Sequence, residues 1–227
     1  MGDSPVKVRE ESVKGEFVDL EGERFYKISH VDRMPDFFMS IVSASDHWMF
    51  ISSNGSLSAG RKNRDNALFP YYQVDKIHDY RGITGSRTYC LVEKENRLFL
   101  WEPFTGESEK IYNIQRNLYK SIYGNKLAFE EINLDLEICF RYEWSNSERF
   151  GWVKTSHLSN TGKSLTRIEV LDGLRNLLPY GVDYAFQTEY SNLLDAYKTV
   201  SYTHLTLPTI EEGVGRGGGG GVIGWGG

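Results

Sequence analysis

Hydrophobic and polar side chains alternate with a period of two along residues 134–144. One side of this run carries only apolar or aromatic residues: Leu134, Leu136, Ile138, Phe140, Tyr142 and Trp144. Successive side chains of a β-strand point to opposite faces, so the run predicts a half-buried strand. The run is longer than most strands of soluble proteins, which span about 3–10 residues. It therefore indicates a broad sheet rather than a small barrel.

The segments that follow and precede this run carry the same signal. The chain turns at residues 145–147 and returns at 150–155, and a second turn at 159–163 leads into 165–170. Three successive strands joined by polar turns predict an antiparallel meander. Further strands are predicted at residues 36–42, 47–51, 57–61, 88–92 and 97–101, with an Asn54-Gly55 turn among them. No repeat of fixed period appears, which disfavours a propeller or solenoid, and the body is predicted to be all-β.

The period changes near residue 190. Tyr190, Leu193, Leu194 and Tyr197 are spaced as i, i+3, i+4 and i+7, and Thr188 can serve as the N-cap. A short helix is therefore predicted over residues 188–198.

The last stretch of the chain differs from the rest. Residues 200–209 (VSYTHLTLPT) resemble the in-frame translation of a transposase sequencing adaptor, and five consecutive glycines follow at 217–221. Residues 199–227 are accordingly expected to be a non-native, disordered segment, comparable to a fusion scar, that is not part of the native fold. A natural glycine-rich tail is the alternative. The remaining organisation is a lead-in at 1–24, a sandwich domain at 25–187 and the start of a linker helix at 188–198.

Composition describes an ordinary globular body. Hydrophobic residues make up 40% of the chain and aromatic residues 14%, enough for a sizeable core. The formal charge is -5, of which Glu211, Glu212 and Arg216 contribute -1, leaving -4 on the body. An acidic body without a basic cluster argues against a nucleic-acid partner. No apolar leader and no run of about 18 apolar residues is present, so a cytoplasmic protein without membrane contact is expected, with Cys90 and Cys139 as buried or idle thiols.

Motifs for catalysis, cofactors or metals are weak. Gly162-Lys163-Ser164 ends like a phosphate-binding loop, but such a loop needs a second glycine where His157 stands, and a following helix. A hairpin turn is expected there instead. The body histidines show no metal-ligand spacing: His30, His47, His78 and His157. We therefore nominate no catalytic, cofactor-binding or metal-ligating residue.

The remaining candidates are carboxylates, tryptophans and one polar loop. The pairs Glu107/Glu109 and Glu130/Glu131 have polar sequence neighbours and are expected to be solvated. Tryptophans could stack on sugar rings, but core packing is the favoured interpretation of Trp48, Trp101, Trp144 and Trp152. Residues 60–66 (GRKNRDN) are rich in directional donors, so Arg61, Lys62, Arg64 and Asp65 are nominated as a contact loop, with a solvated loop as the alternative.

Several segments in order resemble the start of inverting disaccharide phosphorylases of the cellobiose and chitobiose phosphorylase type. They are residues 35–42 (PDFFMSIV), 53–56 (SNGS), 60–72 (GRKNRDNALFPYY), 100–103 (LWEP) and 158–165 (LSNTGKSL). Order and spacing match over roughly residues 25–175. The glycine-rich stretch that those enzymes carry before the Arg-Asp-Asn loop is shortened here, which indicates a diverged branch.

The resemblance implies a fold and a role. The fold would be a galactose-mutarotase-like super-sandwich of two large antiparallel sheets, followed by linker helices and an (α/α)6 barrel. In that family the catalytic acid and phosphate-binding residues lie in the barrel, and no residue here matches them. The chain would then be a non-catalytic N-terminal domain of a glycoside phosphorylase or hydrolase, inactive alone. Its expected partners are the barrel of the same chain, a second copy in a homodimer and an oligosaccharide substrate.

Two alternatives stay open. One is a stand-alone carbohydrate-binding or scaffolding sandwich. The other is a mutarotase-like enzyme, which would need histidine and carboxylate side chains converging in one groove.

Overall fold

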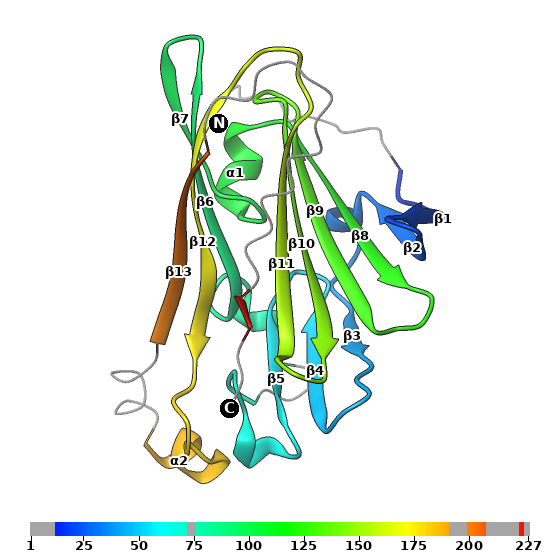
Figure 1. The fold of residues 1–227 in the computed structure, drawn as a ribbon, viewed down its shortest axis with the longest axis vertical. Coiled ribbons are helices and arrows are strands. Elements are labelled where there is room, and N and C mark those ends of the chain that lie inside the picture. Colours follow the sequence, from blue (N-terminus) through cyan, green and yellow to red (C-terminus); the bar gives the residue numbers. More distant parts are fainter. Residues whose placement is uncertain (1–11, 72–75, 191–198, 208–222, 225–227) are drawn as a thin grey trace, which may run out of the picture.

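The computed structural model describes residues 12–71, 76–190, 199–207 and 223–224, and their strands form three antiparallel sheets (Figure 1). The largest sheet has the order β1-β2-β8-β9-β10-β11-β14. Its strands are β1 (Lys14–Leu20), β2 (Glu23–Ser29), β8 (Ile114–Ser121), β9 (Lys126–Asn133), β10 (Ile138–Ser147), β11 (Gly151–Asn160) and β14 (Ile223–Gly224).

Two smaller sheets complete the fold. The four-stranded sheet has the order β13-β12-β6-β7 and comprises β13 (Thr199–Leu207), β12 (Arg167–Leu177), β6 (Gly85–Lys94) and β7 (Arg97–Trp101). The three-stranded sheet comprises β3 (Phe38–Ile41), β4 (His47–Ser52) and β5 (Leu57–Arg61). Helices are short: α1 (Gly106–Ile111), α2 (Tyr184–Glu189), and the 3-10 turns η1 (Val31–Arg33), η2 (Arg64–Asn66) and η3 (Ile77–Tyr80).

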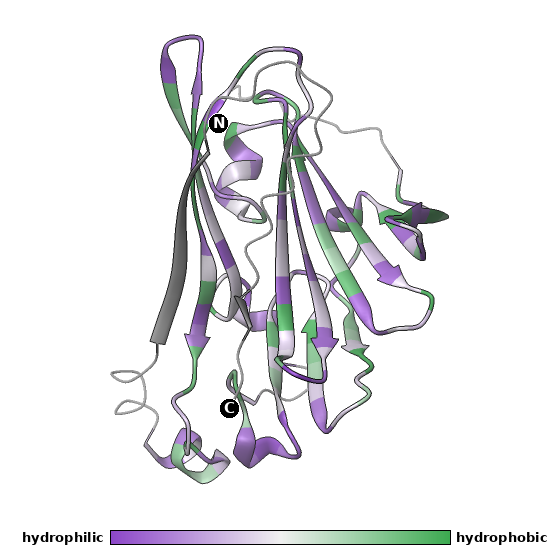
Figure 2. Ribbon diagram, viewed as in Figure 1, coloured by the Kyte–Doolittle hydropathy of each residue, from purple (hydrophilic) through white to green (hydrophobic). Residues whose placement is uncertain are grey.

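One hydrophobic core joins the three sheets. Along both larger sheets hydrophobic and hydrophilic residues alternate (Figure 2), and many of the hydrophobic residues are buried in the core. The core draws residues from β3 to β12, and its bulkiest fully buried members include Trp101, Trp144, Phe69 and Phe140. Alternation turns one face of each sheet into apolar surface, and burying those faces against each other drives the assembly. The prediction of an all-β antiparallel sandwich is confirmed.

Most predicted strands are found where the pattern placed them. The strands predicted at 36–42, 47–51 and 57–61 are β3, β4 and β5, and Gly55 turns the β4–β5 hairpin with φ 89°. The hairpin of 88–92 with 97–101 is β6–β7, and its turn uses Glu95 and Asn96, both with positive φ. A two-residue turn of that kind matches the right-handed twist of the paired strands.

The long alternating run is shorter as a strand than the sequence indicates. Residues 134–137 form the β9–β10 turn, and β10 begins at Ile138. The turn is stabilised by side chains, because Asn133 Oδ1 accepts from Leu136 N at 3.0 Å and Asp135 Oδ2 accepts from Asn113 N at 2.7 Å. Asn and Asp compete for backbone donors in this way and favour turns. Leu134 is 55% exposed in consequence.

The third strand of the predicted meander lies in the other sheet. β10 and β11 pair as predicted, but β12 pairs with β6 and not with β11. The loop at residues 161–166 carries the chain across the core, and β12 then buries Ile168, Val170 and Leu174 against the large sheet. Alternation specifies which side chains of a strand face inward but not which strand it pairs with.

The domain boundary expected at residue 25 lies too late. β1 occupies residues 14–20, and it pairs with β2 over its whole length. The segment interpreted as a lead-in therefore contributes a strand to the large sheet. The polar residues of this edge strand obscured the alternating pattern that would have predicted it.

The predicted linker helix is tested only at its first residues. The helix α2 begins after Asp183, whose side chain accepts from Phe186 N at 2.7 Å and so acts as the N-cap. Thr188 lies in the last turn and donates to Tyr184 O at 3.1 Å, so it is not the cap. Residues 191–198 of the predicted helix lie outside the described residues.

The expectation of disorder is wrong for residues 199–207. They form β13, paired antiparallel with β12 from Leu177↔Thr199 to Ile168↔Leu207. The segment is rich in β-favouring residues, and an open strand edge accepts such a segment whatever its origin. The adaptor origin of the segment stays a prediction.

A matched pair of substitutions tests the inward face of β10. Leu134 and Ile138 belong to the same alternating set, but Ile138 is fully buried and Leu134 is exposed. We expect Ile138→Ala to lower the free energy of unfolding by about 2–5 kcal/mol through lost burial and a cavity. Leu134→Ala should change it by less than about 0.5 kcal/mol. Urea unfolding measures both, and equal losses for the two variants would contradict the assigned strand start.

Candidate functional site

The nominated contact loop forms a packed corner against α2. Arg64 lies over the ring of Tyr184 at 4.4 Å, and Asp65 Oδ1 accepts from Tyr184 N at 3.2 Å. Arg61 Nε donates to Asp46 Oδ1 at 2.9 Å. Within the described part of the chain, Lys62 is the member of the nominated set whose side chain has no partner.

The corner is held together by hydrogen bonds between side chains and its backbone. Asn63 caps η2 by accepting from Asp65 N at 3.1 Å, and Trp48 Nε1 donates to Asn63 O at 3.2 Å. Gly60 is required here, because an added Cβ would lie 2.6 Å from both Asn66 O and the Trp48 ring. The directional groups of Arg61, Arg64 and Asp65 therefore serve intramolecular contacts, and the loop positions α2.

The four body histidines do not converge. His47 lies on β4, where its Nδ1 hydrogen-bonds Ser45 Oγ at 2.6 Å, while His78 Nδ1 hydrogen-bonds Ser52 Oγ at 2.7 Å. His157 lies on β11 and His30 at the start of η1. Burial lowers the pKa of His47 and of His157. Among the described residues no group of three or more His, Cys, Asp or Glu side chains is placed to hold a metal ion.

The expectation of a solvated carboxylate is wrong for Glu131. It was expected to be solvated, but it is fully buried and bonded through both oxygens. Trp101 Nε1 donates to Oε1 at 2.9 Å, and Arg116 Nε and Phe104 N donate to Oε2 at 2.7 Å each. Arg116 also donates to Thr105 O and pairs with Glu109. Burial raises the pKa of Glu131, and the Arg116 guanidinium opposes that rise.

The Glu131 network joins separate parts of the sandwich. Trp101 ends β7, Arg116 and Glu131 face each other across β8 and β9, and Thr105 caps α1. Polar neighbours in sequence did not reveal this burial, because Glu131 and Glu130 point to opposite faces of the same strand. Glu130 accepts from Tyr119 OH at 2.7 Å on the other face.

A second buried network crosses between the two larger sheets. Lys154 Nζ on β11 donates to Asp172 Oδ1 on β12 at 2.6 Å. Thr88 Oγ1 donates to the same oxygen at 2.7 Å, and Ser156 Oγ donates to Oδ2 at 2.7 Å. Burial lowers the pKa of Lys154, while the Asp172 carboxylate opposes that shift. Both networks are closed sets of partners, typical of structural ion pairs.

Three tryptophans and both thiols belong to the core. Trp101, Trp144 and Trp152 are buried, which confirms core packing as their role, while Trp48 is half-buried in the α2 corner. Cys90 and Cys139 are buried free thiols, as expected, and burial raises the pKa of Cys139 to about 12. A thiol with so high a pKa is not a nucleophile near neutral pH.

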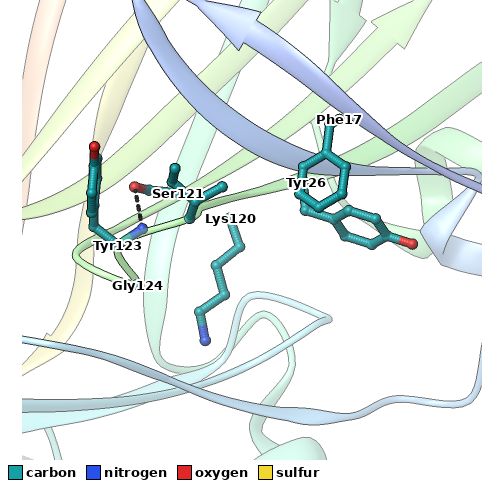
Figure 3. Close-up of a pocket in the computed structure, with 7 residues that line it drawn as sticks. Phe17, Tyr26, Lys120, Ser121, Tyr123 and Gly124 are labelled. Atoms are coloured by element: carbon teal, nitrogen blue, oxygen red, sulfur yellow. Dashed lines mark hydrogen bonds between the residues drawn. The ribbon is translucent and has the colours of Figure 1, made fainter.

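An open groove lined by aromatic side chains lies at the β1–β2–β8 end of the large sheet (Figure 3). Its volume is about 520 Å³, within the range of ligand pockets. The floor is formed by Phe17, Tyr26 and Lys120, and the wall by the β8–β9 turn at residues 121–124. Phe17 and Tyr26 are 59% and 42% exposed.

The floor residues form one row across three strands. Phe17 pairs with Tyr26, and Tyr26 pairs with Lys120, in the strand register. The rings of Phe17 and Tyr26 meet edge to face with centroids 5.2 Å apart. The wall is fixed, because Tyr123 N donates to Ser121 Oγ at 3.2 Å and Val42 N donates to Gly124 O at 2.8 Å.

Sequence reasoning missed this groove. Phe17 and Tyr26 lie in apolar-containing segments on either side of a Glu21-Gly22 turn, which is a hairpin signal. The signal was available, but an aromatic at an alternating position predicts core packing equally well. Only the three-dimensional structure distinguishes the two roles, through exposure.

Comparison with models of protein families and with curated proteins gives no match for this chain. The likeness to disaccharide phosphorylases therefore stays a prediction based on the motifs themselves. Among the described residues, no helix combines the length and apolar character needed to cross a bilayer.

Removing Arg116 tests the buried network. We expect Arg116→Ala to lower the free energy of unfolding by about 3–5 kcal/mol at pH 7, because Glu131 is left buried without its cation. Arg167 makes only exposed ion pairs, so Arg167→Ala should cost about 0–1 kcal/mol.

The stability loss of Arg116→Ala should also depend on pH. Without Arg116 the folded pKa of Glu131 rises further above its unfolded value, so the folded state binds the extra proton. The stability loss should shrink as the pH falls toward 4.5 and grow as the pH rises. Urea unfolding between pH 4.5 and 7.5 measures it, and a loss independent of pH would contradict the role given to Glu131.

Proposed function

We propose that this chain is the non-catalytic β-sandwich module of a carbohydrate-active enzyme, a glycoside phosphorylase or hydrolase whose reaction centre lies in an (α/α)6 barrel of the parent protein. The observation that carries the proposal is an apolar strip on the outer face of the four-stranded sheet. A sandwich needs only its inner faces to fold, so an apolar outer face indicates a further contact surface.

The strip is centred on the edge strand β7. Phe99 and Trp101 face the core, so Leu98 and Leu100 face outward, where they are 66% and 55% exposed. Leu91 of β6 lies opposite Leu100 in the register. Natural edge strands are usually protected by charge, by covering or by shortness. Two exposed leucines on one edge strand fit a surface that another domain covers.

The motif resemblance supplies the chemistry of the proposal. The segments that resemble the phosphorylases include β3, the β4–β5 turn and the corner that holds α2, and in that family the barrel follows the sandwich through linker helices. The buried networks also support a non-catalytic role. The carboxylate oxygens of Glu131 and Asp172 are bonded within the fold and do not face a substrate.

A second candidate function is a stand-alone carbohydrate-binding sandwich. The observation in its favour is the aromatic groove, since exposed aromatic faces beside polar groups suit a sugar ring.

The apolar strip is tested with a double substitution. We expect the unmodified protein to bind 8-anilinonaphthalene-1-sulfonate and to self-associate at high concentration, because the leucines are uncovered. Leu98→Lys/Leu100→Lys should reduce the dye fluorescence by about half or more and give a monomer by light scattering. Leu134→Lys, at a similarly exposed leucine outside the strip, is the matched control and should change neither.

Two outcomes would contradict the proposal. One is dye binding that the double variant leaves unchanged. The other is phosphorolysis or hydrolysis of cellobiose or chitobiose by the chain alone. A discrete dimer that persists at low concentration and is dispersed by the double variant would instead identify a second copy as the occupant of the strip.

A further inference from the structure

The groove is the uncovered continuation of the face that builds the core. The row Phe17, Tyr26, Lys120 continues in the strand register to Leu127 and Trp144, which are buried. On β2 the change occurs within two residues of the same face, because Ile28 packs against the core and Tyr26 is 42% exposed. The groove therefore presents side chains to solvent from a rigid sheet.

The aromatic pair gives the groove an apolar surface with a fixed shape. Phe17 and Tyr26 are held edge to face at 5.2 Å, so they present two inclined surfaces rather than one flat one. Such surfaces suit the CH-bearing face of a sugar ring. Tyr123, 71% exposed, adds a third ring to the lining on the far side of Lys120, and in Figure 3 this ring points away from the ammonium group.

Lys120 supplies a positive charge without a balancing carboxylate. Its neighbours in the register are Tyr26 and Leu127, and no ion pair joins it to any acidic side chain in the described part of the chain. In Figure 3 its side chain lies between the Phe17–Tyr26 pair and the Tyr123–Gly124 turn. An ammonium in that position is available to an anionic ligand.

The other charges around the groove do not cancel that one. Glu23 is occupied, because Ser121 Oγ donates to it at 2.6 Å and Lys126 Nζ at 2.5 Å. Arg24 lies over the Phe17 ring at 5.1 Å and adds a second cation on the same face. Asp19 lies opposite Arg24 in the register on that face and offsets its charge, so Lys120 supplies the remaining positive charge.

We infer that this groove binds an acidic saccharide, with the sugar ring on Phe17 and Tyr26 and its carboxylate or phosphate group at Lys120 Nζ. The inference rests on the carbohydrate-binding candidate function and specifies its ligand class. A neutral sugar would use the rings but leave Lys120 unpaired. An acidic peptide would use Lys120 but lacks the ring face that the aromatic pair accommodates.

Titration calorimetry at low salt tests the inference with four probes: trigalacturonate, glucose 6-phosphate, cellotriose and triglutamate. We expect at least one acidic sugar to bind about tenfold or more tightly than cellotriose and triglutamate. The tighter of the two acidic sugars identifies the anion as carboxylate or phosphate. Raising the salt concentration should weaken the preference, because the ammonium is exposed to screening.

Three variants assign the contributions. Lys120→Ala should remove the preference for the acidic sugar and leave binding of cellotriose unchanged, and Lys120→Arg should keep the preference. Tyr26→Ala should weaken every saccharide by about tenfold. Lys110→Ala removes an exposed lysine on α1 and is the matched control, expected to bind as the unmodified protein does. Equal midpoints of urea unfolding establish that each variant is folded.

The outcomes separate this inference from the candidate function beneath it. Equal affinity for cellotriose and both acidic sugars overturns the acidic ligand and leaves carbohydrate binding standing. Equal affinity for triglutamate overturns the saccharide and leaves a general anion site. Absence of binding to all four probes overturns both. A Lys120→Ala variant that retains the preference also overturns the inference.

Discussion

The fold depends on burial of one face of the large sheet against two smaller sheets. That burial needs side chains alternating strictly in and out along each strand, because a shift of one residue would turn the apolar set to solvent. β10 illustrates the requirement, since Ile138, Phe140, Tyr142 and Trp144 are all buried. The strand length and the hairpin turns are secondary to it, as they only bring such faces into contact.

Buried ion pairs add to this apolar contact where separate strands and helix α1 meet. Arg116 and Glu131 are adjacent in the large sheet, but their remaining bonds go to Trp101 on β7, to Phe104 and Thr105 before α1, and to Glu109 on α1. An ion pair in an apolar interior contributes little net free energy, yet removing either partner is costly. The network therefore adds little to the stability of the fold. Its main effect is to disfavour arrangements in which α1 lies elsewhere, because these would break its bonds. Lys154 and Asp172 impose a similar condition on β11 and β12.

The sequence predicted the strands far better than their partners. Alternation identified β3 to β7, β10 and β11 because the inward face is a local property of each segment. It placed β12 in the wrong sheet, because its pairing with β6 depends on residues some eighty positions away, as in Thr88 with Asp172. Glu131 was misjudged for the same reason, since the burial of a carboxylate depends on a cation from another strand. The nominated loop was identified as rich in donors, but its partner Tyr184 lies 119 positions from Asp65.

The groove follows from the same constraint that builds the core. A sheet wider than its cover must end with residues that keep the inward orientation but lack a partner layer. On β2 that end falls between Ile28 and Tyr26, and the side chains beyond it are aromatic and cationic rather than uniformly polar. A position selected only for solubility would favour small polar or charged residues there. The combination of Phe17, Tyr26 and Lys120 on this face fits the proposed ligand, while the cross-strand contact of the two rings also stabilises the β1–β2 hairpin.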